Sequence, residues 1–286
     1  MKLIKYFFQF LFIIFFFSLF KFFGFKISSK IGGKLFEIIG PIFRSKKLIH
    51  SNIKKAFPEI NSDEIKKLTK LMWNNYGRVF SEYMFIKDFR FGKIDSKIDI
   101  IGKDILDEIK KSNKPVVFIS GHFSNFELMA MQIEKVGIEL SAIYRPLNNI
   151  FLNRVIEKIR KKYICKNQIR KGVGGLKKLI NLIKNNYSTA LMIDQRVSQG
   201  IATNFFNQEA LTTTVPAQLV KKYKTPVVPI FIERINDINF KIVIKNPINF
   251  NNEASVKDIT NQLNHVLEEM ILYKPEQWIW SHNRWK

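Results

Sequence analysis

The chain opens on an almost unbroken apolar run. Residues 6–20, YFFQFLFIIFFFSLF, include only two polar side chains, and Lys21 follows them. Fifteen residues at a helical rise of about 1.5 Å span roughly 22 Å, less than a hydrocarbon core of about 30 Å. Phe22, Phe23 and Phe25 extend the run close to that length if Lys21 directs its charge to the interface. The pattern predicts a membrane anchor within residues 1–26.

A cleaved signal peptide and a helix lying in the membrane interface are the two alternatives to this anchor. Lys2 and Lys5 match the basic start of a signal peptide, but the bulky segment SLFKFFGF has no small-residue cleavage site. We therefore favour an uncleaved anchor followed by one domain over residues 27–286. By the positive-inside tendency this domain is expected on the cytoplasmic side, because basic residues are denser after the run, at Lys21, Lys26, Lys30 and Lys34.

Helical periodicity appears at both ends of the remaining chain. Residues 61–85 carry apolar side chains at helical spacing, and Asn61 and Glu64 match a capping box at the start. Residues 256–271 form a second apolar stripe, and His265 lies off its centre, as expected of a surface residue. The two segments predict long helices on either side of a central region.

In the central region, short apolar runs alternate with helical patterns. This alternation predicts an α/β fold with a mainly parallel central sheet flanked by helices on both faces. The strand-like runs are PVVFIS (115–120), LSAIYR (140–145), TALMID (189–194), TPVVPIFI (225–232) and FKIVIK (240–245). The helical segments between them are 125–137, 153–163, 175–186 and 215–224.

Polar side chains follow three of these strands at their carboxyl ends. His122 comes after the first strand, and Arg145 and Asp194 close the next two. In open α/β sheets, binding and chemistry collect at this edge. The sequence therefore predicts that His122, Arg145 and Asp194 share one edge of the sheet.

The segment HFSNFE, residues 122–127, has two interpretations. Ser124 and Glu127 fit a capping box at the start of a helix, which would leave His122 as a loop residue. Alternatively, the turn from strand to helix folds His122 toward Glu127, whose carboxylate orients the imidazole and stabilises its protonated form. The local pattern is compatible with both.

Other kinds of site are disfavoured. Ser124 lacks the glycine spacing of a nucleophile elbow, and no H-E-x-x-H or clustered Cys/His spacing predicts a metal site. Cys165, the only cysteine, has no histidine near it in sequence and is interpreted as structural. A histidine–carboxylate pair without a protein nucleophile suggests that His122 deprotonates a substrate hydroxyl, which attacks a carbonyl directly.

The charge is strongly basic, since 47 Lys and Arg against 24 Asp and Glu leave a net charge of +23. Residues 21–55 hold nine basic side chains and one acid, and residues 151–184 hold eleven and one. Such blocks are either solvated helix faces or surfaces for acidic partners, including an anionic membrane surface. We expect no nucleic-acid partner, because no RNP-type, zinc-knuckle or helix-turn-helix pattern accompanies them.

Several segments in this order resemble the lipid A biosynthesis lauroyl/myristoyl acyltransferase family, within the wider glycerolipid acyltransferase superfamily. They are GHFSNFE, AIYRPLNN, NRVIEKIRKKY, LMIDQR, ALTTTVPAQLVKKYKTPVVPIFIER and the terminal PEQWIWSHNRWK. The resemblance runs from about residue 50 to the end, and an N-terminal anchor is also usual. It implies transfer of a fatty acyl chain from acyl carrier protein to a hydroxyl of a membrane glycolipid at the inner membrane, without a cofactor or metal.

The resemblance assigns roles to individual residues. It places the general base at His122 and its acidic partner at Glu127, and Arg145 matches a residue that binds phosphate through its planar fork. The further substrate-binding positions that it implies are Arg160, Asp194, Gln195, Thr213 and Arg284. Thr213 or Thr214 fits a helix cap equally well, and backbone amides from Gly121 to Asn125 are candidate oxyanion donors. The tail residues Trp278, Trp280 and Trp285 fit packing or interfacial anchoring better than catalysis.

Two other functions stay open at this point. The first is an acyltransferase that acts on a different acceptor, such as a lysophospholipid or a mannolipid. The second is a non-catalytic basic protein that binds a membrane or a nucleic acid, and it would show no thioester-dependent release of carrier thiol. If the protein is an acyltransferase, its basic blocks favour acyl carrier protein, an acidic donor, over acyl-coenzyme A.

Overall fold

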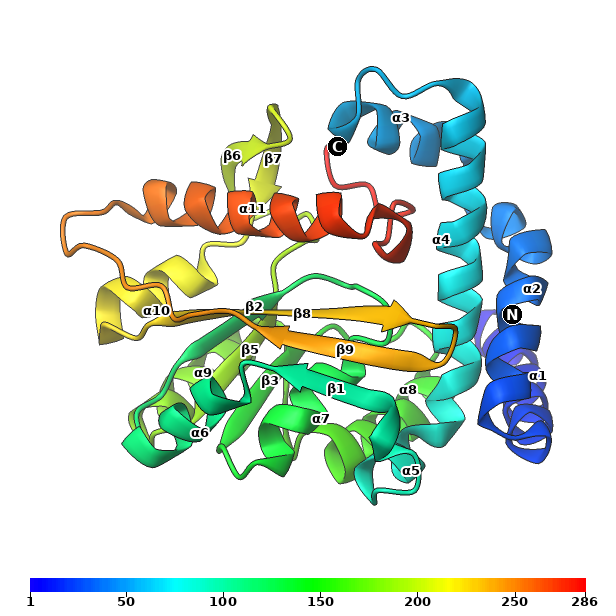
Figure 1. Cartoon of the computed structure of the whole chain (residues 1–286), viewed down its shortest axis with the longest axis horizontal. Helices are drawn as coiled ribbons and strands as arrows, with labels where there is room; N and C mark the ends of the chain where they lie inside the picture. Colours follow the sequence, from blue (N-terminus) through cyan, green and yellow to red (C-terminus); the bar gives the residue numbers. More distant parts are fainter.

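The core of the protein is a seven-stranded, mainly parallel sheet with helices on both faces (Figure 1). In this computed structural model, residues 1–172 and 174–286 are described in full, and residue 173 only through its place in helix α9. The strand order is β1-β9-β8-β2-β5-β3-β4, and only the β8–β9 pair is antiparallel. The strands are β1 (Ile98–Ile101), β2 (Val117–Ser120), β3 (Leu140–Tyr144), β4 (Asn167–Arg170), β5 (Ser188–Met192), β8 (Val227–Ile235) and β9 (Asn239–Ile244). The predicted fold class is confirmed.

Helices supply the layers around this sheet, with α7 on one side and α11 on the other (Figure 1). Every residue of β2 is buried, as expected for a central strand covered on both faces. A small antiparallel hairpin of β6 (Ile201–Phe205) and β7 (Gln208–Thr212) packs against α11. The helices after the first strand are α6 (Lys103–Ser112), α7 (Glu127–Lys135), α8 (Ile150–Ile159), α9 (Val173–Lys184), α10 (Val215–Tyr223) and α11 (Val256–Tyr273).

Helix α4 (Ser62–Glu82) borders the sheet and supports the N-terminal helices (Figure 1). Its predicted capping box is confirmed: Asn61 Oδ1 accepts from the Glu64 amide at 3.0 Å, and the Glu64 side chain accepts from the Asn61 amide at 3.0 Å. Helix α2 (Phe25–Phe43) approaches α4 closely, because a Cβ on Gly77 would lie 2.0 Å from the Gly32 oxygen. Helices α3 (Lys46–Ala56) and α5 (Ile86–Arg90) complete this side.

Helix α1 (Lys2–Phe23) is long and apolar enough to cross a membrane, a test that a signal sequence also passes. One face packs on the protein, where Phe17 and Phe20 are buried near Phe80. The opposite face exposes large apolar side chains, namely Leu3, Ile4, Phe7, Phe8, Leu11, Phe12, Phe15, Phe22 and Phe23. Gly24 separates α1 from α2 with a φ of +77°, a conformation that favours glycine. The division into residues 1–26 and 27–286 stays a prediction.

The predicted strands and helices of the central region are confirmed, with ends that move by a few residues. Four short strands were not predicted: β1 and β4 at the two edges of the sheet, and β6 and β7 in the hairpin. Cys165 is buried and its pKa is raised to about 12 by burial, which supports the structural interpretation. His265 is exposed, as predicted.

Candidate active site

Two neighbouring strands bring the central residues of the site together. β2 ends at Ser120 and β5 at Met192, and these two residues are partners in the parallel ladder. His122 therefore lies two residues beyond the end of one strand, and Asp194 two residues beyond the end of the other. The prediction that they share one edge of the sheet is confirmed.

Asp194 holds His122 through both the ring and the backbone. The distance from His122 Nδ1 to Asp194 Oδ1 is 2.8 Å, and the His122 amide donates to Oδ2, also at 2.8 Å. Trp278 Nε1 donates to the same Oδ2 at 3.0 Å. The Asp194 side chain is fully buried and that of His122 is 22% exposed. Because Nδ1 faces the carboxylate, Nε2 is the ring nitrogen left for a substrate, and it has no hydrogen-bond partner among the described residues.

The charges of this pair shift both pKa values. Burial lowers the pKa of His122, but the charge and hydrogen bond of Asp194 outweigh burial and raise the pKa above its ordinary value of 6.5. Burial raises the pKa of Asp194, and the interactions with His122 bring it below its ordinary value of 3.8. The carboxylate thus stabilises the imidazolium that forms when His122 accepts a proton.

Glu127 has a different partner. Its Oε1 accepts from Arg160 Nε at 2.7 Å and lies 2.6 Å from Arg160 Nη2, and the carboxylate is only 8% exposed. The expectation that Glu127 orients the His122 ring is therefore corrected, since Asp194 makes that hydrogen bond. The physical reason is that a buried carboxylate pairs with the guanidinium that the segment after α8 places beside it. The negative charge of Glu127 still adds to the raised pKa of His122.

The capping-box interpretation of Ser124 is wrong. Helix α7 begins at Glu127 after Phe126, and no side chain caps it. Ser124 has a φ of +40°, and its hydroxyl is buried without a partner among the described residues. The amides of residues 122, 123 and 124 donate, in that order, to the Asp194 carboxylate, the Gly121 carbonyl and the Gln277 carbonyl. Most of the amides considered as oxyanion donors are thus already engaged.

The whole chain, residues 1–286, matches the model of the family described as bacterial lipid A biosynthesis acyltransferase. The chain belongs to this family. It is 22% identical over 251 residues to the lipid A biosynthesis myristoyltransferase of Escherichia coli K12, covering 87% of this chain and 76% of that protein. The lauroyltransferase of the same organism is 22% identical over 249 residues, with coverage of 85% and 79%. The protein is therefore an acyltransferase.

Among solved structures, the chain is similar to the 1-acyl-sn-glycerophosphate acyltransferase of Thermotoga maritima. The alignment covers 90% of this chain and 100% of that chain, at 11% identity and a TM-score of 0.41. The fold class of the present protein follows from its own sheet order and helix layers, described above.

The other predicted binding residues of the acyltransferase differ in accessibility. Arg145 is exposed just after β3, and it forms no ion pair with any described residue. Gln195 is half-buried next to Asp194. The Thr213 hydroxyl accepts from the Val215 amide at 3.4 Å at the start of α10, whereas Thr214 forms no side-chain cap. Arg145 is thus the residue of this set most open to an anionic ligand.

The prediction that Arg284 binds substrate is wrong. Arg284 is fully buried, where Nη1 donates to the Leu211 carbonyl at 3.0 Å and Nη2 to the Thr212 hydroxyl at 2.7 Å. Its guanidinium also lies 4.6 Å from the centre of the Phe205 ring, and burial lowers its pKa to about 10. Arg284 ties the C-terminal segment to the β6–β7 hairpin and is unavailable to a phosphate.

Sequence reasoning missed two groups around the histidine, one that bonds to Asp194 and one that bonds to Asn125. Trp278, interpreted as a packing residue or an interfacial anchor, donates to Asp194. Glu82, buried at the end of α4, accepts from Asn125 Nδ2 at 3.2 Å and from both terminal nitrogens of Arg234, at 2.5 and 2.9 Å. These partners come from segments far apart in the chain, and no local pattern marks them. Among the described residues, no three His, Cys, Asp or Glu side chains gather as a metal site.

Proposed function

We propose that this protein transfers a fatty acyl chain from the thioester of acyl carrier protein to a hydroxyl of a lipid A precursor. Membership of the lipid A acyltransferase family supports the reaction class and the pathway. The Escherichia coli relatives are named for myristoyl, lauroyl and palmitoleoyl transfer, which supports a fatty acyl donor. The observation that carries the proposal is that the buried Asp194 holds the Nδ1 side of His122, while Nε2 has no partner among the described residues.

In the proposed reaction, His122 Nε2 takes the proton of the acceptor hydroxyl while its oxygen attacks the thioester carbonyl. The new C–O bond forms, the C–S bond breaks, and the imidazolium returns the proton to the leaving thiolate. The products are an ester on the lipid and a free thiol on the carrier. Asp194 stabilises the imidazolium between these steps, as the aspartate does in a serine–histidine–aspartate triad. Unlike that triad, the proposed reaction forms no acyl-enzyme.

We assign Glu127 and Arg160 a supporting role in the same chemistry. Glu127 keeps the buried guanidinium in place and adds negative potential at His122. Arg145, exposed at the same sheet edge, is proposed to bind a phosphate of the donor arm or of the acceptor. Gln195 and Thr213 are proposed to line the same substrate path.

We further propose that α1 holds the protein at the inner membrane, with the catalytic domain on the cytoplasmic side. Most of the exposed side chains of α1 are apolar, and α2 places exposed Ile27 and Ile31 beside Lys26 and Lys30. An apolar face bordered by lysines suits the boundary between acyl chains and anionic headgroups. Recovery of the full-length protein in the soluble fraction at low salt would contradict this arrangement.

The test uses the purified full-length protein with acylated carrier protein and a lipid A precursor lacking its secondary acyl chains. We expect release of free carrier thiol together with one added acyl chain on the lipid by mass spectrometry. The His122→Ala variant should form neither product. Thiol release without acylated lipid would contradict the proposed acceptor, and the absence of both products with wild-type protein would contradict the proposed function.

A further inference from the structure

The basic block at residues 151–184 divides into paired and unpaired charges. Arg160 pairs with Glu127 inside the site, and Lys161 and Arg170 pair with Glu157 at 2.8 and 2.9 Å. Glu157 stays ionised, because hydrogen bonds from Lys161 and Arg170 lower its pKa to about 2. The block is therefore not one uniform positive surface, and only part of it is free to attract an acidic partner.

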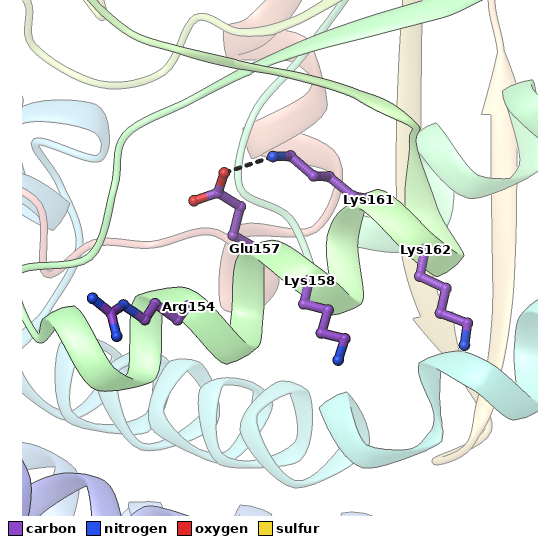
Figure 2. Close-up of a pocket in the computed structure, with 5 residues that line it drawn as sticks. All are labelled: Arg154, Glu157, Lys158, Lys161 and Lys162. Atoms are coloured by element: carbon purple, nitrogen blue, oxygen red, sulfur yellow. Dashed lines mark ion pairs between the residues drawn. The ribbon is translucent and has the colours of Figure 1, made fainter.

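One unpaired group lies along the outer side of α8 and of the π-helical turn η3 (Arg160–Ile164). Arg154, Lys158 and Lys162 are exposed and form no ion pair with any described residue. Together with Glu157 and Lys161 they line a shallow depression of about 510 Å³ (Figure 2). We call the surface formed by these five residues the α8 basic face.

The α8 basic face lies next to the active site. The same helical segment carries Arg160, whose side chain points inward to Glu127 while the basic side chains point outward. Arg154 and Arg160 are separated by six residues, or about 9 Å along a helix, and a helix with its side chains is about 10–12 Å wide. A partner on the outer side is thus about one helix width from the buried Glu127–Arg160 pair.

The composition of this face distinguishes it from the membrane surface of the protein. All five lining side chains are charged. A peripheral lipid site normally combines basic residues with an apolar anchor. In this protein the exposed large apolar side chains are most numerous on α1 and α2, and none of them is among the five residues of the α8 basic face. Helix α1 packs against the start of α8 through Phe7 and Phe151, with ring centres 5.6 Å apart. A concave, wholly charged surface beside that helix suits an acidic protein better than lipid.

We propose that the α8 basic face is the docking surface for the acidic carrier protein that brings the acyl thioester. The inference rests on the proposed function and identifies the surface at which the acyl donor binds. Unpaired surface cations attract an acidic partner over several ångströms and raise the rate of productive encounter. A carrier bound there can extend its acylated arm around α8 to His122 while the lipid acceptor enters from the side of α1.

The test compares two full-length charge-reversal variants. The first replaces three residues of the face, Arg154→Glu, Lys158→Glu and Lys162→Glu. The control makes the same change in charge on exposed residues of α9, Lys177→Glu, Lys178→Glu and Lys184→Glu. Each is assayed at low salt with an acylated carrier protein and with a carrier-free acyl-pantetheine thioester.

For the first variant, we expect the KM for the carrier-bound donor to rise about tenfold or more, since electrostatic steering changes association rates by roughly 10–10³. The KM for acyl-pantetheine should stay within about twofold, as should both values for the α9 control. The wild-type KM for the carrier should also rise with salt, because exposed charges are screened beyond about 8 Å at physiological ionic strength.

Each other outcome overturns a defined part of the proposal. An equal rise in KM for both donors, or an equal effect of the α9 control, would exclude the α8 basic face as the docking surface. An unchanged carrier KM with lost binding to phosphatidylglycerol vesicles would make it a lipid surface. No transfer from either donor by wild-type protein would overturn the proposed function itself.

If the triple variant does not fold, the single Lys158→Glu variant should still raise the carrier KM selectively, and an unchanged value would contradict the proposal.

Discussion

Asp194 and Glu127 are two buried carboxylates in one site, yet they bind different partners. Glu127 is five residues from His122 in sequence and forms an ion pair with Arg160. Asp194 is 72 residues away and holds both the ring and the amide of His122. Strand pairing explains the difference, because β2 and β5 are neighbours and their carboxyl ends coincide. Distance along the chain is thus a poor guide to which acid serves a histidine at a sheet edge.

The two carboxylates should therefore affect catalysis differently. Loss of the Asp194 charge removes a direct hydrogen bond and the strongest opposing charge from His122. Loss of the Glu127 charge acts on His122 only at longer range and leaves Arg160 as an uncompensated buried cation. Variants at the two positions can be ranked by activity and by the pH dependence of activity.

The largest effect is expected at the histidine. His122→Ala should lower kcat/KM by about 10²–10⁴, the usual contribution of general-base catalysis. The matched control is His265→Ala on the exposed side of α11, which should remain fully active. Thiol release should be measured for both, with thermal unfolding as a check on folding. Near-normal activity of His122→Ala would exclude this residue as the base.

Asp194→Asn should have the next largest effect, a loss of about 10²-fold, because hydrogen bonds to charged groups contribute about 1.5–3 kcal/mol. The pH profile gives a sharper test. Asp194 raises the pKa of His122, so activity should rise with pH through a value above 6.5 in the wild-type protein. In the variant, burial dominates and lowers that pKa, so the acidic limb of kcat/KM should move to lower pH while the maximum falls. An unmoved limb would contradict the assignment of Asp194.

Glu127→Gln should cost less, about tenfold in kcat/KM, because its effect on His122 is a long-range charge effect. Its acidic limb should move in the same direction as that of Asp194→Asn but by a smaller amount. The melting temperature should fall as well, since Arg160 loses its buried counter-charge. A larger activity loss and a larger pH shift than Asp194→Asn would reverse the comparison and make Glu127 the main partner of the histidine.

The smallest effect is expected at Trp278. Trp278→Phe keeps most of the buried aromatic volume and removes only the Nε1 donor to Asp194. Because His122 still donates two hydrogen bonds to the carboxylate, we expect a loss of about threefold in kcat/KM and little change in the acidic limb. A loss as large as that of Asp194→Asn would show that Trp278, rather than His122, sets the orientation of the carboxylate.

Hydrophobic periodicity predicted most of the fold. The buried strands are continuous apolar runs, and the capping box at Asn61 marks the start of α4, so local physics was sufficient there. The edge strands β1 and β4 were missed because each is four residues long and mixes polar with apolar positions. Ser124 was misread as a cap because its backbone adopts a left-handed conformation that the residue types around it do not reveal.

The sequence by itself determined that His122, Arg145 and Asp194 lie at the carboxyl ends of strands, because strand ends follow from local patterning. Only the tertiary structure decided which of the acids reaches the histidine, which basic side chains remain unpaired on α8, and that Arg284 is buried. These outcomes depend on strand order and on packing between segments as far apart as Arg284 and Thr212. Buried charges pair according to their distance in space, because burial removes an ion from water and only a nearby opposite charge offsets that desolvation cost.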